Sequence, residues 1–134
     1  MLCNIIQYNG KFGFDVGSNS LEPGASILNY FRHSDRVNQQ FEIRDTLIFC
    51  VNSNLVLEAR DGLIQGSYII QNYPNGSINQ KFYFKSDGTI RTENGLCIDT
   101  ESGKCDKSPL ILNKCSSKPS QQFHISNEYV LSIV

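Results

Sequence analysis

The sequence predicts an all-β fold made of three similar repeats, and two observations support this prediction. A Gln-x-Phe motif occurs three times, so its glutamines stand 41 residues apart in both intervals, at Gln39, Gln80 and Gln121. Apolar residues alternate with polar ones or form short runs rich in Ile, Phe and Tyr, and turn pairs that contain glycine separate these runs. A constant period indicates a repeat architecture, and this apolar pattern indicates strands rather than helices.

Two further landmarks precede each motif in the same order. A short strand carries an acid 24, 22 and 22 residues before the motif glutamine, and the three acids are Asp15, Glu58 and Asp99. An aliphatic strand ends fifteen residues after each acid, at Tyr30, Tyr73 and Lys114. We therefore expect about four short strands in each repeat.

For the first repeat we place the strands near residues 3–8, 11–16, 26–31 and 39–43. Helical arrays have repeats of similar length but a different apolar period, and propellers typically need four or more blades. About twelve strands in three repeats instead predict one β-trefoil domain with pseudo-threefold symmetry over residues 1–134. Its repeats fall near residues 1–45, 46–87 and 88–134. We also expect residues 128–133 to be the first strand of an absent fourth repeat, which pairs near the N-terminal strand and removes a sheet edge.

Composition and charge exclude several classes of function. The net charge is −1 and only 19% of residues are charged, so we expect neither nucleic acid nor an anionic membrane surface as a partner. No stretch approaches the roughly 18 apolar residues of a membrane span, so we expect no membrane insertion. The first residues lack the regions of a signal peptide. We expect a cytoplasmic protein if the chain is full length, and a secreted or cell-surface protein if a signal has been removed.

Catalytic and metal-binding residues are few. The only histidines are His33 and His124, and none of the five cysteines forms a C-x-x-C pair, so we expect no metal site and no cofactor. The three acids lie on separate lobes of the predicted fold, too far apart for a pair of catalytic carboxylates. We therefore expect no enzymatic activity.

The landmarks resemble those of the ricin-type β-trefoil lectins, whose repeats end in Gln-x-Trp. The third repeat is the most similar one, with Asn-Gly-Leu-Cys-Ile-Asp ending at Asp99, Leu-Ile-Leu-Asn-Lys-Cys ending at Cys115, and Gln-Gln-Phe ending at Phe123. The resemblance covers essentially the whole chain. One departure is consistent, because phenylalanine replaces the motif tryptophan at Phe41, Phe82 and Phe123. We expect these rings to fill the core in its place.

The resemblance implies a sugar site in each repeat. Such a site takes the acid, the aromatic residue that ends the third strand, and the Asn-Gln pair before the motif aromatic. A carboxylate accepts hydrogen bonds from neighbouring hydroxyls, and an aromatic ring packs against the C–H face of a sugar. Two roles stay open for the motif glutamines: direct contact with the ligand, or tying backbone groups of a loop together.

The three repeats keep this set to different degrees. The first has a complete set in Asp15, Tyr30, Asn38 and Gln39, and His33 is expected in an exposed loop beside it. The second is expected to be weaker because its acid is a glutamate, and its set is Glu58, Gln71, Tyr73, Asn79 and Gln80. The third is expected to be degenerate, with Ser120 replacing the asparagine and Lys114 the aromatic, beside Asp99 and Gln121. An Asp99–Lys114 contact would be a surface salt bridge of little value.

The resemblance also implies a disulfide within the third repeat, between Cys97 and Cys115. The alternative is a pair of thiols, and Cys105 lies between them in sequence as a competing partner. We expect Cys3 and Cys50 to be reduced.

Two functions of different classes follow. The resemblance implies a lectin that binds galactose-type or N-acetylgalactosamine-type glycans or glycoproteins, with its main site in the first repeat. The alternative is a non-catalytic trefoil scaffold that binds a protein partner, as an inhibitor or an assembly subunit. A homodimer also stays open.

Overall fold

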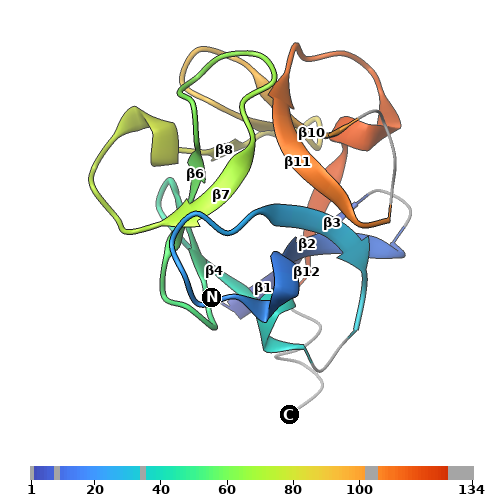
Figure 1. The fold of residues 1–134 in the computed structure, drawn as a ribbon. Helices are drawn as coiled ribbons and strands as arrows, with labels where there is room; N and C mark the ends of the chain where they lie inside the picture. Colours follow the sequence, from blue (N-terminus) through green and yellow to red (C-terminus); the bar gives the residue numbers. More distant parts are fainter. Residues whose placement is uncertain (1, 8–9, 34–35, 102–105, 127–134) are drawn as a thin grey trace.

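The computed structural model describes residues 2–7, 10–33, 36–101 and 106–126, which form a β-trefoil (Figure 1). The all-β fold predicted from the repeats is confirmed. None of the helices in this part of the chain has the length and apolar character needed to cross a membrane. The strands are β1 (Leu2–Gln7), β2 (Phe12–Val16), β3 (Ile27–Phe31), β4 (Phe41–Arg44), β5 (Leu47–Cys50), β6 (Val56–Ala59), β7 (Ile69–Asn72), β8 (Tyr83–Phe84), β9 (Ile90–Arg91), β10 (Cys97–Thr100), β11 (Ser108–Asn113) and β12 (Phe123–Ser126).

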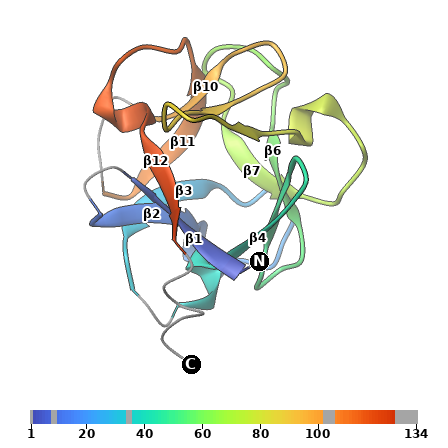
Figure 2. The same ribbon diagram turned by 180° about the vertical axis from the view of Figure 1, so that it is seen from behind.

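Six of the strands form a ring around the core. Strand β1 pairs with β4 and β12, β4 pairs with β5, and β8 pairs with β9, all antiparallel. Two backbone hydrogen bonds of 2.8 Å link the remaining neighbours, from the amide of Phe82 to the carbonyl of Thr46 and from the amide of Phe123 to that of Gly88. Figure 2 shows β12 lying beside β1. The ring therefore has β12 on one side of the N-terminal strand and β4 on the other.

The other six strands form three hairpins, β2–β3, β6–β7 and β10–β11, which surround the pseudo-threefold axis in Figure 1. The hairpins also contact one another. Strand β11 pairs with β3 through Ser108 and Asn29, and single bridges join Ser26 to Ile70 and Tyr68 to Ile111. A site on one hairpin can therefore include residues from another repeat.

The motif phenylalanines fill the core, as predicted. Phe41, Phe82 and Phe123 are 0%, 1% and 6% exposed. The ring of Phe14 packs edge-to-face against Phe41 and Phe123, with centroids 6.2 and 5.2 Å apart. The residue before each acid is also fully buried, so each repeat contributes equivalent side chains to one core, and these residues are Phe14, Leu57 and Ile98.

The strand expected at residues 39–43 begins only at Phe41, because Gln39 belongs to a 3₁₀ helix, Val37–Gln39. The strand expected at residues 128–133 lies outside the described residues. The strand that pairs with β1 on that side is β12, which follows the third motif directly.

Cys3 and Cys50 are free thiols in the core. Burial raises the pKa of Cys3 to about 11 and that of Cys50 to about 12, so both stay protonated and unreactive at neutral pH.

Candidate functional site

Asp15 is the centre of the candidate site. It lies in β2, where it is 2% exposed, and each of its carboxylate oxygens accepts a hydrogen bond from a side-chain amide. Asn38 Nδ2 donates to Oδ1 at 2.9 Å, and Gln39 Nε2 donates to Oδ2 at 2.8 Å. Burial raises the pKa of Asp15, and the hydrogen bond from Gln39 and the charge of Arg36 offset this only in part. The two amides therefore hold the carboxylate in place, but its hydrogen bonds and the nearby charge do not fully offset the cost of burying it.

A surface depression of about 580 Å³ opens above this carboxylate, and we call it the Asp15 pocket. Asp15, Leu28 and Tyr30 share one face of the β2–β3 hairpin, because Asp15 pairs with Leu28 and the side-chain period of a strand is two residues. The residues that line the pocket are Asp15, Ser18, Asn19, Leu28, Tyr30, Arg36, Val37, Asn38 and Lys107. The structure thus brings together three of the four side chains expected in the first repeat.

The fourth, Gln39, does not line the pocket. It is 3% exposed and its amide is fully used: Nε2 donates to Asp15 and to the carbonyl of Phe31, while Oε1 accepts from the amide of His33. Gln80 and Gln121 make the same three kinds of contact, to Glu58 and Asp99 and to their own loops. The sequence left two roles open for the motif glutamines, and this geometry matches the one in which they tie backbone groups of a loop together. The other role, direct contact with the ligand, was expected for Gln39, Gln80 and Gln121 and does not match the structure.

The register of the hairpins differs between the repeats. Asp15 pairs with Leu28, thirteen residues later, whereas Glu58 pairs with Ile70 and Asp99 with Ile111, each twelve residues later. The first hairpin therefore has one extra residue. A second extra residue lies in the following loop, because His33 precedes its bonded glutamine by six positions, but Asn75 and Ser116 precede theirs by five.

The register corrects the expected positions of Tyr73 and Lys114. The residues that stand where Tyr30 stands are Asn72 and Asn113, so a fixed count of fifteen residues from the acid is wrong for the second and third repeats. Tyr73 is instead 64% exposed, and its carbonyl binds Gln80. The ring of Tyr30 forms the aromatic wall of the Asp15 pocket, and no aromatic residue stands at the equivalent positions of the other two repeats.

In the second repeat, side chains of the protein itself already donate hydrogen bonds to the acid, Glu58. Glu58 accepts hydrogen bonds from Asn72 at 3.1 Å and from Gln80 at 2.9 Å. Asn79 is half-buried, and its backbone amide donates to the hydroxyl of Ser77, which caps the 3₁₀ helix Ile78–Gln80. Gln71, expected as an added sugar contact, is 0% exposed, which corrects that expectation. Its amide nitrogen donates to the carbonyls of Ser20 and Glu22 in the first repeat.

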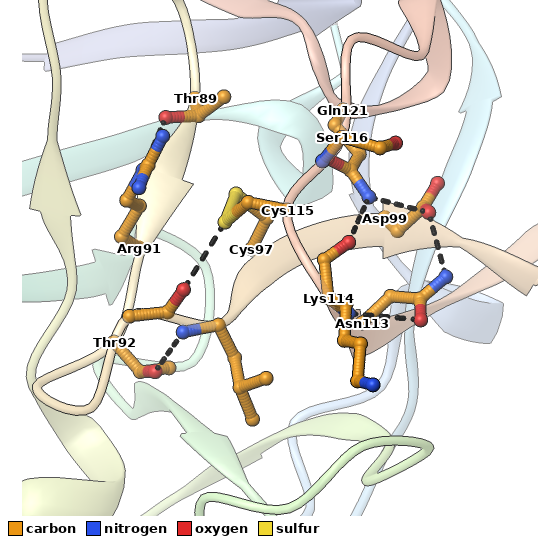
Figure 3. The surroundings of a disulfide bond; sticks show 12 residues. Thr89, Arg91, Thr92, Cys97, Asp99, Asn113, Lys114, Cys115, Ser116 and Gln121 are labelled. Atoms are coloured by element: carbon orange, nitrogen blue, oxygen red, sulfur yellow. Dashed lines mark hydrogen bonds between the residues drawn. A yellow bond between two sulfur atoms is a disulfide. The ribbon is translucent and has the colours of Figure 1, made fainter.

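In the third repeat too, side chains of the protein donate hydrogen bonds to the acid, Asp99 (Figure 3). Asp99 Oδ2 accepts from Asn113 at 3.1 Å and from Gln121 at 3.0 Å, and Oδ1 accepts from the amide of Thr100 at 2.7 Å. Burial works to raise the pKa of Asp99, but these hydrogen bonds, with one from Ser120, outweigh it and lower the pKa. The Lys114 ammonium points away from Asp99 in Figure 3, so the expected salt bridge is corrected.

Cys97 and Cys115 form a disulfide beside this acid, with their Cα atoms 5.1 Å apart (Figure 3). This is the pairing that the resemblance implied. Cys105 lies outside the described residues.

Two cations also line the Asp15 pocket, Arg36 and Lys107, which the sequence motifs did not predict. Arg36 lies in the loop that carries the second extra residue, and the acid-to-glutamine spacing of 24 rather than 22 residues was its signal. Lys107 belongs to the third repeat and reaches the pocket because Ser108 pairs with Asn29. Nothing local in the sequence points to Lys107.

The histidines take no part in lining the pocket. His33 is half-buried rather than exposed, and its ring packs against Phe31 with centroids 5.6 Å apart. His124 is exposed. Among the described residues, no group of three or more His, Cys, Asp or Glu side chains is placed to hold a metal ion.

Comparison with a family model places residues 47–132 of the chain in the ricin-type beta-trefoil lectin domain. This match covers more than half of the sequence. No curated protein matches the sequence.

Solved structures share the fold at low sequence identity. A designed threefold symmetric protein, ThreeFoil, aligns with a TM-score of 0.82 and 21% identity, covering 94% of this chain and 98% of its own. The C-half of an earthworm R-type lectin in complex with GalNAc aligns with a TM-score of 0.78 and 16% identity, covering 93% and 97%. A non-toxic homologue of type II RIPs from Momordica charantia, in complex with α-methyl-D-galactoside, aligns with a TM-score of 0.78 and 19% identity, covering 93% of this chain and 47% of that one.

Proposed function

The chain belongs to the ricin-type β-trefoil lectin domain family, and from that premise we propose that it is a non-catalytic carbohydrate-binding module that uses the Asp15 pocket as its main site. The ligands we propose are glycans or glycoproteins that present galactose or N-acetylgalactosamine. Two structural relatives were solved with sugars of this kind, GalNAc and α-methyl-D-galactoside.

The chemistry of the pocket supports this proposal. The Asp15 carboxylate can accept hydrogen bonds from two neighbouring sugar hydroxyls. Oδ1 of Asn38 can accept one from a third group, since its Nδ2 already donates to Asp15 and to the carbonyl of Val16. Tyr30 offers an apolar ring on which the C–H face of a sugar can pack. Gln39 holds Asp15 in place from behind, so its role is positioning rather than contact.

The observation that carries the proposal is the difference between the three acids. Glu58 and Asp99 each accept a hydrogen bond from an asparagine in the place of Tyr30, whereas Asp15 has a tyrosine there and opens into a pocket. We therefore propose that the second and third repeats do not bind sugar through these acids.

A glycan array with the wild-type chain and Asp15→Asn tests the proposal. The substitution keeps the size of the side chain but replaces one acceptor oxygen with a donor, so the galactose-type signals should fall at least about tenfold. Asp99→Asn makes the same change in the repeat without the pocket. It should keep the signals of the wild type, provided that circular dichroism shows both variants to be folded.

A blank array with the folded wild-type chain would contradict the sugar-binding proposal and favour the trefoil scaffold that binds a protein partner. Signals that survive in Asp15→Asn but vanish in a variant of the second repeat, such as Glu58→Gln, would contradict the choice of site. A single site of this kind gives roughly millimolar affinity, so the array should present the glycans at high density.

A further inference from the structure

Two cations flank the aromatic wall of the Asp15 pocket. The Arg36 guanidinium lies 5.8 Å from the centroid of the Tyr30 ring, and the Lys107 ammonium lies 5.9 Å from it. Both residues are exposed and both line the pocket. A sugar that packs on Tyr30 thus comes within reach of both charged groups.

The cations come from different repeats. Arg36 precedes the 3₁₀ helix Val37–Gln39, in the loop with the extra residue, and Lys107 precedes β11. The pairing of β11 with β3 brings Lys107 beside Tyr30, since the neighbouring Ser108 pairs with Asn29. The two charges therefore reach the pocket from loops of two different repeats.

The positive charge is local to the pocket. Among the described residues, the charged ones that line it are Arg36, Lys107 and Asp15, so two cations stand against one carboxylate, while the whole chain carries a net charge of −1. When the Asp15 carboxylate is engaged by sugar hydroxyls, both cations remain available for a group of opposite charge. A neutral galactoside could accept hydrogen bonds from them but would not compensate their charge.

We propose that the Asp15 pocket selects galactose-type glycans that carry an anionic group, either a sulfate ester or a carboxylate, which Arg36 and Lys107 bind while Asp15 accepts hydroxyl hydrogen bonds. This inference rests on the proposed sugar site and adds the class of ligand. The planar guanidinium of Arg36 can donate two parallel hydrogen bonds to either anion, and Lys107 adds a point charge.

Isothermal titration with a panel of galactosides tests the inference. The panel contains methyl galactoside, its isomeric monosulfates and a sialylated galactoside, so the sulfate and carboxylate arms are separate. At least one anionic ligand should bind about tenfold more tightly than methyl galactoside. Because the pocket is open to solvent, this preference should shrink when salt is raised from about 50 mM to about 500 mM.

Substitutions assign the preference to the two cations. Arg36→Gln and Lys107→Gln should each lower the ratio of anionic to neutral affinity by about threefold or more, and the double variant should bring it near one. Lys118→Gln removes the same charge from an exposed position outside the pocket and should keep the wild-type ratio. Melting curves confirm that each variant is folded.

The outcomes separate this inference from the proposed function. Equal affinity for neutral and anionic galactosides, with binding still dependent on Asp15, overturns the anionic selectivity and leaves the sugar site standing. An anionic preference that survives in the double variant also overturns it. If no galactoside binds, both the inference and the proposed function fail.

Discussion

Asp15 and Asp99 occupy equivalent positions, yet their surroundings shift the pKa of the two carboxyl groups in opposite directions. Four hydrogen-bond donors satisfy Asp99 and lower its pKa, whereas the burial of Asp15 dominates over the hydrogen bonds from Gln39 and Asn38 and raises its pKa. A buried carboxylate with unused acceptor capacity costs free energy until a ligand supplies donors. This contrast between two aspartates in one chain is what a binding residue and a structural residue are expected to show.

The raised pKa of Asp15 predicts the pH dependence of sugar binding. Since its pKa in the folded state lies above the value of 3.8 for a free aspartate, protonated Asp15 favours the folded state. That contribution to stability is present at low pH and is lost as the pH rises through the raised pKa. Sugar affinity runs the other way, because only the carboxylate accepts two hydroxyl hydrogen bonds.

We therefore expect affinity to fall about tenfold per pH unit once the pH drops below the pKa of Asp15, and to begin falling at a higher pH than for an ordinary aspartate. Isothermal titration between about pH 7 and about pH 4 measures this. A flat profile over this range in the folded protein would contradict the assignment of Asp15 as the acceptor.

At the scale of elements, one residue of hairpin length decides which side chain faces each acid. The extra residue in β2–β3 puts Tyr30 beside Asp15, and the shorter β6–β7 and β10–β11 hairpins put Asn72 and Asn113 beside their acids. An asparagine there donates a hydrogen bond to the acid. The shorter hairpins thus turn a potential ligand site into an internal contact.

Tyr30→Ala and Tyr73→Ala test this reading of the register. Tyr30→Ala should weaken sugar binding about tenfold, because it removes the apolar wall of the Asp15 pocket. Tyr73→Ala is the matched control on an exposed ring and should change affinity and stability by less than about 0.5 kcal/mol. Titration and urea unfolding measure the two quantities, and equal losses in both variants would refute the register argument.

The disulfide in the third repeat joins the start of β10 to the residue two positions beyond the end of β11. A cross-link between residues 18 positions apart should stabilise the folded chain by about 3 kcal/mol through the entropy of the unfolded state. Cys115→Ser should therefore lower the free energy of unfolding by about that amount. Urea unfolding with and without dithiothreitol checks it, since the reductant should destabilise the wild type and leave the variant unchanged.

Sequence reasoning identified most of the candidate site but not all of it. Asp15, Tyr30 and Asn38 were found because they lie within one repeat at recognisable spacings. The positions of Tyr73 and Lys114 were wrong because a fixed count from the acid ignores a one-residue change in hairpin length. Lys107 was out of reach because only the pairing of β11 with β3 brings it to the pocket.

For the whole molecule, the symmetry of the core is stricter than that of the surface. The motif phenylalanines keep a constant interval because all three must reach one packed centre, where a change of length would leave a void or a clash. The fold class could therefore be predicted from the sequence. Loops tolerate insertions, so the lengths of the hairpins and loops, which distinguish the three repeats, do not repeat along the sequence at a constant interval.

Phe82→Ala should show how much one motif ring contributes to this shared core. The side chain is 1% exposed, so its truncation should lower the free energy of unfolding by about 3–5 kcal/mol. Phe82→Leu keeps much of the apolar volume and should cost clearly less. Chemical unfolding measures both, and a loss below about 1 kcal/mol for Phe82→Ala would argue against a core role for this ring.

Gln71 makes the first repeat depend structurally on the second. From the second repeat its side-chain nitrogen binds two carbonyls of the segment that follows the pocket residues Ser18 and Asn19, and the backbone amide of Gly24 donates to its carbonyl. A substitution of Gln71 in the second repeat would therefore disturb the segment beside the pocket of the first, although the acid of the second repeat is bound by its own Asn72 and Gln80. The three repeats are thus not interchangeable modules, because the second supports the backbone of the first.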